Sequence, residues 1–234
     1  MPDDRPLEDL NPYDVMDTEA ARLDAWFGGL HGDAWAAPTA CEGWSVKDVL
    51  AHLGFGEEYN AACLDDAVPA FVERYTSRGA TDVNAFNALG VSDRADRTPD
   101  DLLAEWRHGC ARTRGELRRL DGQQLTTAAG PYPARWQAWH LASELATHAD
   151  DIGLPETTAE APARLAWRIR FARFALDEMR PDVVVEPGAG VTTVRAEGIE
   201  AVLDDAELTA AVNGRLPADR PIDPRLRAAL SALG

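Results

Sequence analysis

One stretch of the sequence, residues 140–151 (HLASELATHADD), places polar groups on what should be the buried face of a helix. Because an α-helix repeats every 3.6 residues, Leu145 and Ile152 fall on one apolar stripe, with His148 between them and Glu144 one turn before His148. An unpaired buried carboxylate costs several kcal/mol, and a divalent cation would offset that cost. The stretch alone also allows a simpler interpretation, a Glu–His pair spaced i,i+4 on an ordinary helix.

Charge and cysteine content exclude several classes of function. The formal net charge of −17 argues against nucleic acid or an anionic membrane surface as the main partner, because both require a basic footprint. The three cysteines are widely spaced and form no CxxC pair, which fits reduced thiols in a cytoplasmic protein. The acidic start, MPDDRPLEDL, is not a signal peptide, and no apolar run is long enough to span a bilayer.

The first two-thirds of the chain predict four long helices. They are expected over about residues 13–28, from Val46 onward, over 99–120 and over 135–152. Ser45 with Asp48 has the spacing of a capping box, and Thr98 followed by proline and two acids is a typical helix start. Residues 66–98 predict only a short helix and an exposed crossover, and residues 130–133 a rigid loop. Four helices of this kind predict a bundle, a fold in which facing helices build metal sites.

The sequence pattern changes after Pro162. Another amphipathic helix is expected over residues 163–179, followed by short β-branched runs separated by glycine and proline, as in strands and turns. Two more short helices are expected over residues 205–212 and 224–233. The fold class is therefore mainly α, a four-helix bundle with a small C-terminal α/β appendage. The expected domains are residues 1–155, the metal-binding bundle, and residues 156–234, the C-terminal helix with the α/β segment.

A third ligand decides between the two interpretations of Glu144 and His148. His52, beside the apolar stripe of the second helix, has no acidic partner three, four or seven positions further along that helix, and a lone helical histidine is more often structural than ligating. Together, His52, Glu144 and His148 would form a set of two imidazoles and one carboxylate that leaves coordination positions open. His140 is an alternative ligand. It lies about 12 Å from His148 along the helix axis, so we assign it to the pocket or its rim.

Two motifs resemble a known family. The run at residues 41–53, CEGWSVKDVLAHL, resembles the signature C-x-G-W-[ST]-V-x-D-[VL]-x-A-H-L of mycothiol-dependent maleylpyruvate isomerase-like proteins, within the DinB/YfiT-like superfamily. The run at residues 144–151, ELATHADD, is similar to the second signature of that family, E-x-x-x-H-x-x-D. The resemblance covers about residues 10–155 and is more specific for the fold and metal site than for the reaction.

The resemblance implies a bundle that binds a divalent metal, usually zinc, through His52, Glu144 and His148. It also implies mycothiol as cosubstrate in isomerisation or S-transfer. Arg215, in a segment similar to the C-terminal part of some family members, would clamp a substrate carboxylate. From the chemistry of metal-bound imidazoles we expect Asp151 to accept a hydrogen bond from His148. Arg215 and Asp151 are the candidate catalytic residues.

The leading functional hypothesis is a metal- and thiol-dependent transferase or isomerase. A metal-bound thiol is deprotonated and becomes nucleophilic, so the expected partners are a low-molecular-weight thiol and a small-molecule electrophile. Two alternatives remain open at this point. One is a metal-dependent hydrolase of the same fold, and the other is a non-catalytic protein that binds a metal or a small molecule.

Overall fold

The computed structural model describes residues 2–233 and divides them into two compact units. One unit is Pro12–Pro155. The other combines the described residues up to Asn11 with those from Glu156 onward. The chain is mainly helical with small sheets, as the sequence predicts. Within the described residues, no helix has the combination of length and apolar character that crossing a membrane requires.

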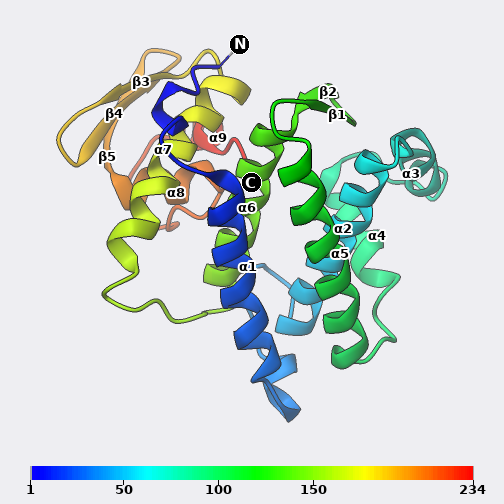
Figure 1. The fold of residues 1–234 in the computed structure, drawn as a ribbon. Coiled ribbons are helices and arrows are strands. Elements are labelled where there is room, and N and C mark those ends of the chain that lie inside the picture. Colours follow the sequence, from blue (N-terminus) through cyan, green and yellow to red (C-terminus); the bar gives the residue numbers. More distant parts are fainter. Residues whose placement is uncertain (1, 234) are drawn as a thin grey trace. The chain divides into compact units, whose positions relative to one another are not determined.

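Four long helices make up the larger unit (Figure 1). They are α1 (Pro12–Gly28), α2 (Val46–Leu64), α5 (Pro99–Arg119) and α6 (Ala134–Asp151). Helix α1 packs along α6 and α2 packs along α5, while α5 also contacts α1 and α6. Their facing sides bury large side chains, among them Phe27, Leu50, Trp106 and Trp139. The predicted four-helix bundle is thus confirmed.

Local sequence signals fix where two of these helices begin. The Ser45 hydroxyl accepts a hydrogen bond from the Asp48 amide, and the Asp48 carboxylate accepts one from the Ser45 amide, so the capping box of α2 is complete. The Thr98 hydroxyl caps α5 by accepting from the Asp101 amide. Each cap satisfies amides that the first helical turn leaves unpaired.

The connection between α2 and α5 is more ordered than predicted. The expected short helix and exposed crossover are instead two helices, α3 (Val68–Thr76) and α4 (Val83–Ser92). Their aromatic side chains form a separate core with Phe55 of α2, in which Phe71 and Tyr75 lie 5.6 and 5.2 Å from the Phe55 ring. The ordering comes from these contacts with α2, which a local pattern does not reveal.

Two further segments of this unit complete it. A short 3₁₀ helix, η2 (Gly32–Ala36), follows α1. The predicted rigid loop before α6 is instead a β-hairpin, in which β1 (Gln124–Thr127) pairs antiparallel with β2 (Gly130–Pro133). The loop prediction failed because Pro131 and Pro133 were read as breakers, although proline is tolerated on an edge strand of a two-stranded sheet.

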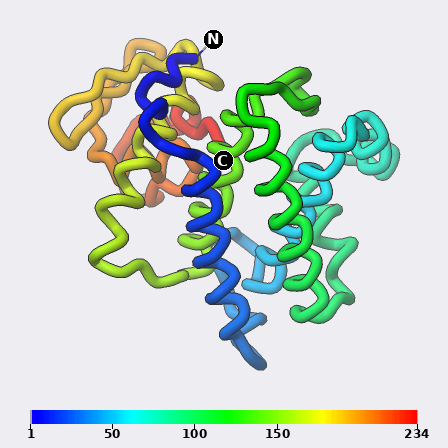
Figure 2. The backbone as a smooth tube through the Cα atoms, viewed as in Figure 1, coloured from blue at the N-terminus to red at the C-terminus, as the bar shows by residue number. Residues whose placement is uncertain are grey.

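The smaller unit contains the predicted mixture of helices and strands. Figure 2 traces its backbone from residue 156 onward in yellow-green to red. Helix α7 (Ala161–Met179) is followed by an antiparallel three-stranded sheet in the order β3 (Val184–Pro187), β4 (Val191–Ala196) and β5 (Ile199–Asp204). Helices α8 (Asp205–Val212) and α9 (Pro224–Leu230) complete it. The N-terminal 3₁₀ helix η1 (Arg5–Leu7) packs against α7 with Leu7 buried.

Candidate metal centre

Helices α2 and α6 bring His52, Glu144 and His148 together. Oε1 of Glu144 lies 2.9 Å from Nε2 of His52 and 3.1 Å from Nε2 of His148. The two imidazole rings meet edge to face with centroids 4.7 Å apart. One donor atom from each residue therefore lies within 4.8 Å of those of the other two.

The two imidazoles are buried, whereas the side chain of Glu144 between them is partly exposed. His52 and His148 are 7% and 6% exposed. The Glu144 side chain is 45% exposed and contributes to the wall of a cavity inside the bundle.

Charges in this cluster are strongly coupled. Burial alone would raise the pKa of Glu144, but His148 and His52 hold it well below its ordinary value. Burial alone would lower the pKa of His148, but Glu144 and Asp151 raise it well above its ordinary value. Without a cation, the site is thus a carboxylate next to an imidazolium.

The second nitrogen of His148 contacts Asp151, as the sequence analysis expected. Nδ1 lies 3.0 Å from Oδ2 of this buried carboxylate. The Cys41 thiol donates to the same oxygen at 3.1 Å, and its sulfur is 3.8 Å from Nδ1 of His148. The Ala40 amide donates to the Asp151 carbonyl at 2.9 Å, which ties the loop of Cys41 to the end of α6. Cys41 is partly exposed and belongs to this cluster.

The second nitrogen of His52 has a different environment. Within the described residues its buried Nδ1 has no hydrogen-bond partner, and the ring lies 5.1 Å from the Trp44 ring at a tilt of 45°. Nε2 is therefore the nitrogen of His52 that can act as a metal ligand together with Glu144 and His148.

This donor set fits a divalent metal. Two imidazoles and one carboxylate are typical protein ligands of zinc, and three such ligands leave a position for water or substrate. The geometry supports Nε2 of both histidines and Oε1 of Glu144 as ligand atoms, because these three atoms converge. Asp151 would then orient His148 from outside the ligand set.

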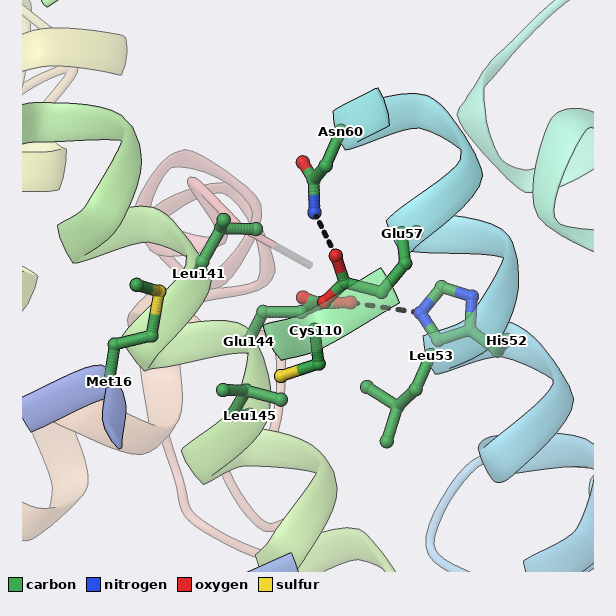
Figure 3. A pocket seen from close by; sticks show the side chains of 10 residues that line it. Met16, His52, Leu53, Glu57, Asn60, Cys110, Leu141, Glu144 and Leu145 are labelled. Atoms are coloured by element: carbon green, nitrogen blue, oxygen red, sulfur yellow. Dashed lines mark hydrogen bonds and ion pairs between the residues drawn. The ribbon is translucent and has the colours of Figure 1, made fainter. Parts of the chain in front are cut away.

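A small cavity of about 30 Å³ adjoins the cluster (Figure 3). This space can hold one or two water-sized groups. Most of its wall is apolar, and its polar lining comes from His52, Glu144, Glu57, Asn60 and Cys110. Sequence patterns did not indicate Glu57, because it lies five positions after His52 and so is not one of its same-face helical neighbours. The available signal was an acid four residues after Leu53 on a core-facing helix.

The remaining candidates lie outside this cavity lining. Nε2 of His140 lies 3.0 Å from the Tyr132 hydroxyl on β2. Arg215 follows α8 in the smaller unit, where its guanidinium donates to the Asn213 carbonyl at 3.2 Å. The substrate-clamping role of Arg215 stays a prediction.

Comparisons with known proteins agree with the two signature motifs. The sequence model of the mycothiol maleylpyruvate isomerase N-terminal domain matches residues 16–153. An uncharacterized protein found in two strains of Mycobacterium tuberculosis is 27% identical over 185 residues, which cover 75% of this chain and 71% of the relative.

Solved structures show the same fold. The crystal structure of the mycothiol-dependent maleylpyruvate isomerase superposes with a TM-score of 0.64 at 17% identity, covering 89% of each chain. A variant of that enzyme superposes with a TM-score of 0.61 at 17% identity, covering 87% of this chain and 88% of the other.

Proposed function

The chain belongs to the family of the mycothiol maleylpyruvate isomerase N-terminal domain, and on that premise we propose that it is a divalent-metal-dependent enzyme acting with a low-molecular-weight thiol. The reaction would be S-transfer to, or isomerisation of, an electrophilic small molecule. The observation that carries the proposal is the position of Oε1 of Glu144, within 3.1 Å of two buried imidazole nitrogens and on the wall of a cavity.

Three side chains would hold the metal, which we propose to be zinc: His52, Glu144 and His148. A bound cation would supply an ionised thiol or a polarised substrate oxygen at neutral pH. The protein supplies the rest. Asp151 holds one ring orientation of His148, and apolar side chains form most of the cavity wall beside the reacting groups.

The thiol fits the chemistry of this site. A free thiol is only a few per cent ionised near neutrality, and the thiolate is the nucleophile. Mycothiol is the cosubstrate named for the structural relative, so we propose it as the thiol used here. The electrophile must carry an oxygen small enough to enter the cavity, such as a carbonyl or a carboxylate. Arg215 is proposed to bind a substrate carboxylate.

Turnover measured with each component omitted in turn tests this function. Chelator-treated protein is reloaded with zinc and assayed with mycothiol and either maleylpyruvate or an aryl halide. We expect product only when both zinc and thiol are present. Product formed without thiol would instead support a metal-dependent hydrolase. Absence of turnover together with zinc binding would support a non-catalytic protein.

A variant tests the ligand assignment separately. His52→Ala removes one of the three proposed ligands, so the protein should lose bound zinc and activity while keeping its helical circular dichroism. The exposed His108→Ala on α5 is the matched control and should keep both. Full zinc content in His52→Ala would remove His52 from the site.

A further inference from the structure

The cavity beside the proposed metal site has a second acidic side chain in its wall. Glu57 of α2 lines it together with His52 and Glu144 (Figure 3). The two carboxyl groups come from different helices, α2 and α6. The metal chemistry proposed above gives Glu57 no role.

Helix α5 has a glycine, Gly109, where it packs against Glu57. A Cβ atom at Gly109 would lie 2.6 Å from Cβ of Glu57, so only glycine lets the two helices approach this closely. Glycine inside a helix costs roughly 0.5–1 kcal/mol relative to alanine. The sequence carries this cost at the point where α5 passes over Glu57.

Hydrogen bonds distinguish the two oxygens of Glu57. The Thr113 hydroxyl donates to Oε2 at 2.5 Å, and the Asn60 amide donates to the same oxygen at 3.3 Å. A neutral carboxyl group has one oxygen that only accepts and one hydroxyl that donates. In a neutral Glu57, the two donors on Oε2 would make it the accepting oxygen, and Oε1 would be the hydroxyl oxygen.

Burial favours the neutral form. It raises the pKa of Glu57, and hydrogen bonds from Thr113, Asn60 and Cys110, together with the charge of Arg114, offset the rise only in part. Arg114, the cation of α5 on this side, is held by Asp17 of α1 at 2.6 Å.

Other groups around the cavity do not place a free positive charge next to Glu57. Burial raises the pKa of the Cys110 thiol of α5, so this thiol stays neutral. His52 and Glu144 are engaged with each other at 2.9 Å. From α1, the cavity lining includes only the apolar side chain of Met16.

We propose that Glu57 is the acid of this site, a neutral carboxyl group whose Oε1 hydroxyl donates to an oxygen of the ligand in the cavity. This inference rests on the proposed function, in which the ligand is an electrophile with a carbonyl or carboxylate oxygen conjugated to its reactive carbon. An ionised Glu57 would repel such an oxygen, whereas a neutral one binds it.

The proton transfer balances without an oxidant or a reductant. After the thiol has lost its proton to solvent, the thiolate forms an S–C bond to the conjugated alkene. The π electron pair moves onto the carbonyl oxygen, which takes the proton from Oε1 of Glu57 and becomes an enol. The return step breaks the S–C bond, releases the thiolate and gives the proton back to Glu57.

Infrared difference spectroscopy tests the protonation state without turnover. The spectrum of zinc-loaded protein at pH 7 minus that of Glu57→Gln should contain the C=O band of a protonated carboxylic acid. Pyruvate, a small α-keto acid, should shift this band. Only a carboxylate band, or a band that pyruvate leaves unmoved, would overturn the proposal. The exposed Glu73→Gln on α3 is the control and should give no such band.

Kinetics test the proton transfer. Glu57→Gln keeps the size and a hydrogen-bond donor but has no proton to give. We expect full zinc content, a KM within a few-fold and a kcat lowered by about 100-fold or more, the range of general acid catalysis. The alkaline limb of the wild-type pH profile should also disappear. Unchanged kcat in Glu57→Gln would overturn the proton transfer.

The two proposals fail separately. If wild type shows no metal- and thiol-dependent turnover, the proposed function fails, while the infrared band and its response to pyruvate still decide the role of Glu57. If Glu57→Gln does not fold, Thr113→Val serves in its place. It removes a donor to Oε2, so it should move the same band and leave zinc content unchanged. An unmoved band would contradict the inference.

Discussion

His148 and Asp151 are in contact at the end of α6, with Nδ1 of the imidazole 3.0 Å from Oδ2 of the carboxylate. Both side chains are buried. Because Nδ1 contacts Asp151, Nε2 is the nitrogen of His148 that can coordinate a metal, and it lies 3.1 Å from Glu144. Orientation of a ligating imidazole by a carboxylate is a common property of metal sites.

Asp151→Asn is the direct test of this relationship. The amide keeps the size of the side chain but removes the charge that stabilises the ring orientation, so zinc affinity should fall by about 10- to 100-fold. Competition with a chromophoric zinc chelator measures it. Asp150→Asn changes the exposed neighbour and should bind as wild type does. Equal affinity of the two variants would show that Asp151 does not orient the ligand.

Cys41 supports the same carboxylate from the loop. Its thiol donates to Oδ2 of Asp151 at 3.1 Å, and Cys41→Ala removes that donor. We expect a loss of about 1 kcal/mol in zinc binding, roughly fivefold in affinity, as for one ordinary hydrogen bond. Cys41→Ser keeps a donor and should recover most of the loss. If alanine and serine behave alike, the hydrogen bond has no effect on the site.

Metal binding and stability should depend on pH in opposite directions. In the metal-free protein the raised pKa of His148 contributes stability that is complete below pH 6.5 and is lost as the pH rises through the folded-state value. The depressed pKa of Glu144 contributes stability that is complete above pH 4.5 and is lost only well below it. This pair thus stabilises the metal-free protein most between pH 4.5 and 6.5.

Zinc must displace the proton of His148, so zinc affinity should rise with pH over the range where metal-free stability falls. Thermal unfolding midpoints from pH 5 to 9, with and without zinc, measure both trends. Calorimetry in buffers of different ionisation enthalpy counts the released protons. His148→Gln should remove this pH dependence. A zinc affinity that does not change from pH 6 to 8 would contradict the coupling.

Gly90 in α4 should tolerate no larger residue. An added Cβ atom would lie 2.2 Å from the Phe55 ring, so Gly90→Ala should destabilise the protein by about 1–3 kcal/mol through overpacking. Gly115 on α5 is the control, because nothing lies within 4 Å of its added Cβ. Gly115→Ala should stabilise the helix by about 0.5–1 kcal/mol. Urea unfolding midpoints compare them, and similar effects would refute the packing argument.

Local patterns predicted the elements whose causes are local. Ser45 and Thr98 announce helix starts because caps satisfy amides within one turn. The four long helices followed from periodicity and these caps. The local sequence pattern predicted too little helix in residues 66–98. The helices there are stabilised by packing against Phe55, which lies outside that segment. It also missed the β-hairpin before α6, which depends on pairing between strands.

The sequence by itself determined the bundle, the starts of its four long helices and, through the two signatures, the three candidate ligands His52, Glu144 and His148. It placed Glu144 and His148 on one face because helical periodicity is a local property. Only the tertiary structure decided that His52 meets them. A separation of 92 residues along the chain between His52 and Glu144 does not fix their distance in space. Only the packing of α5 over α2, permitted by Gly109, decided that Glu57 borders the same cavity. Such convergence is a property of how helices pack against one another.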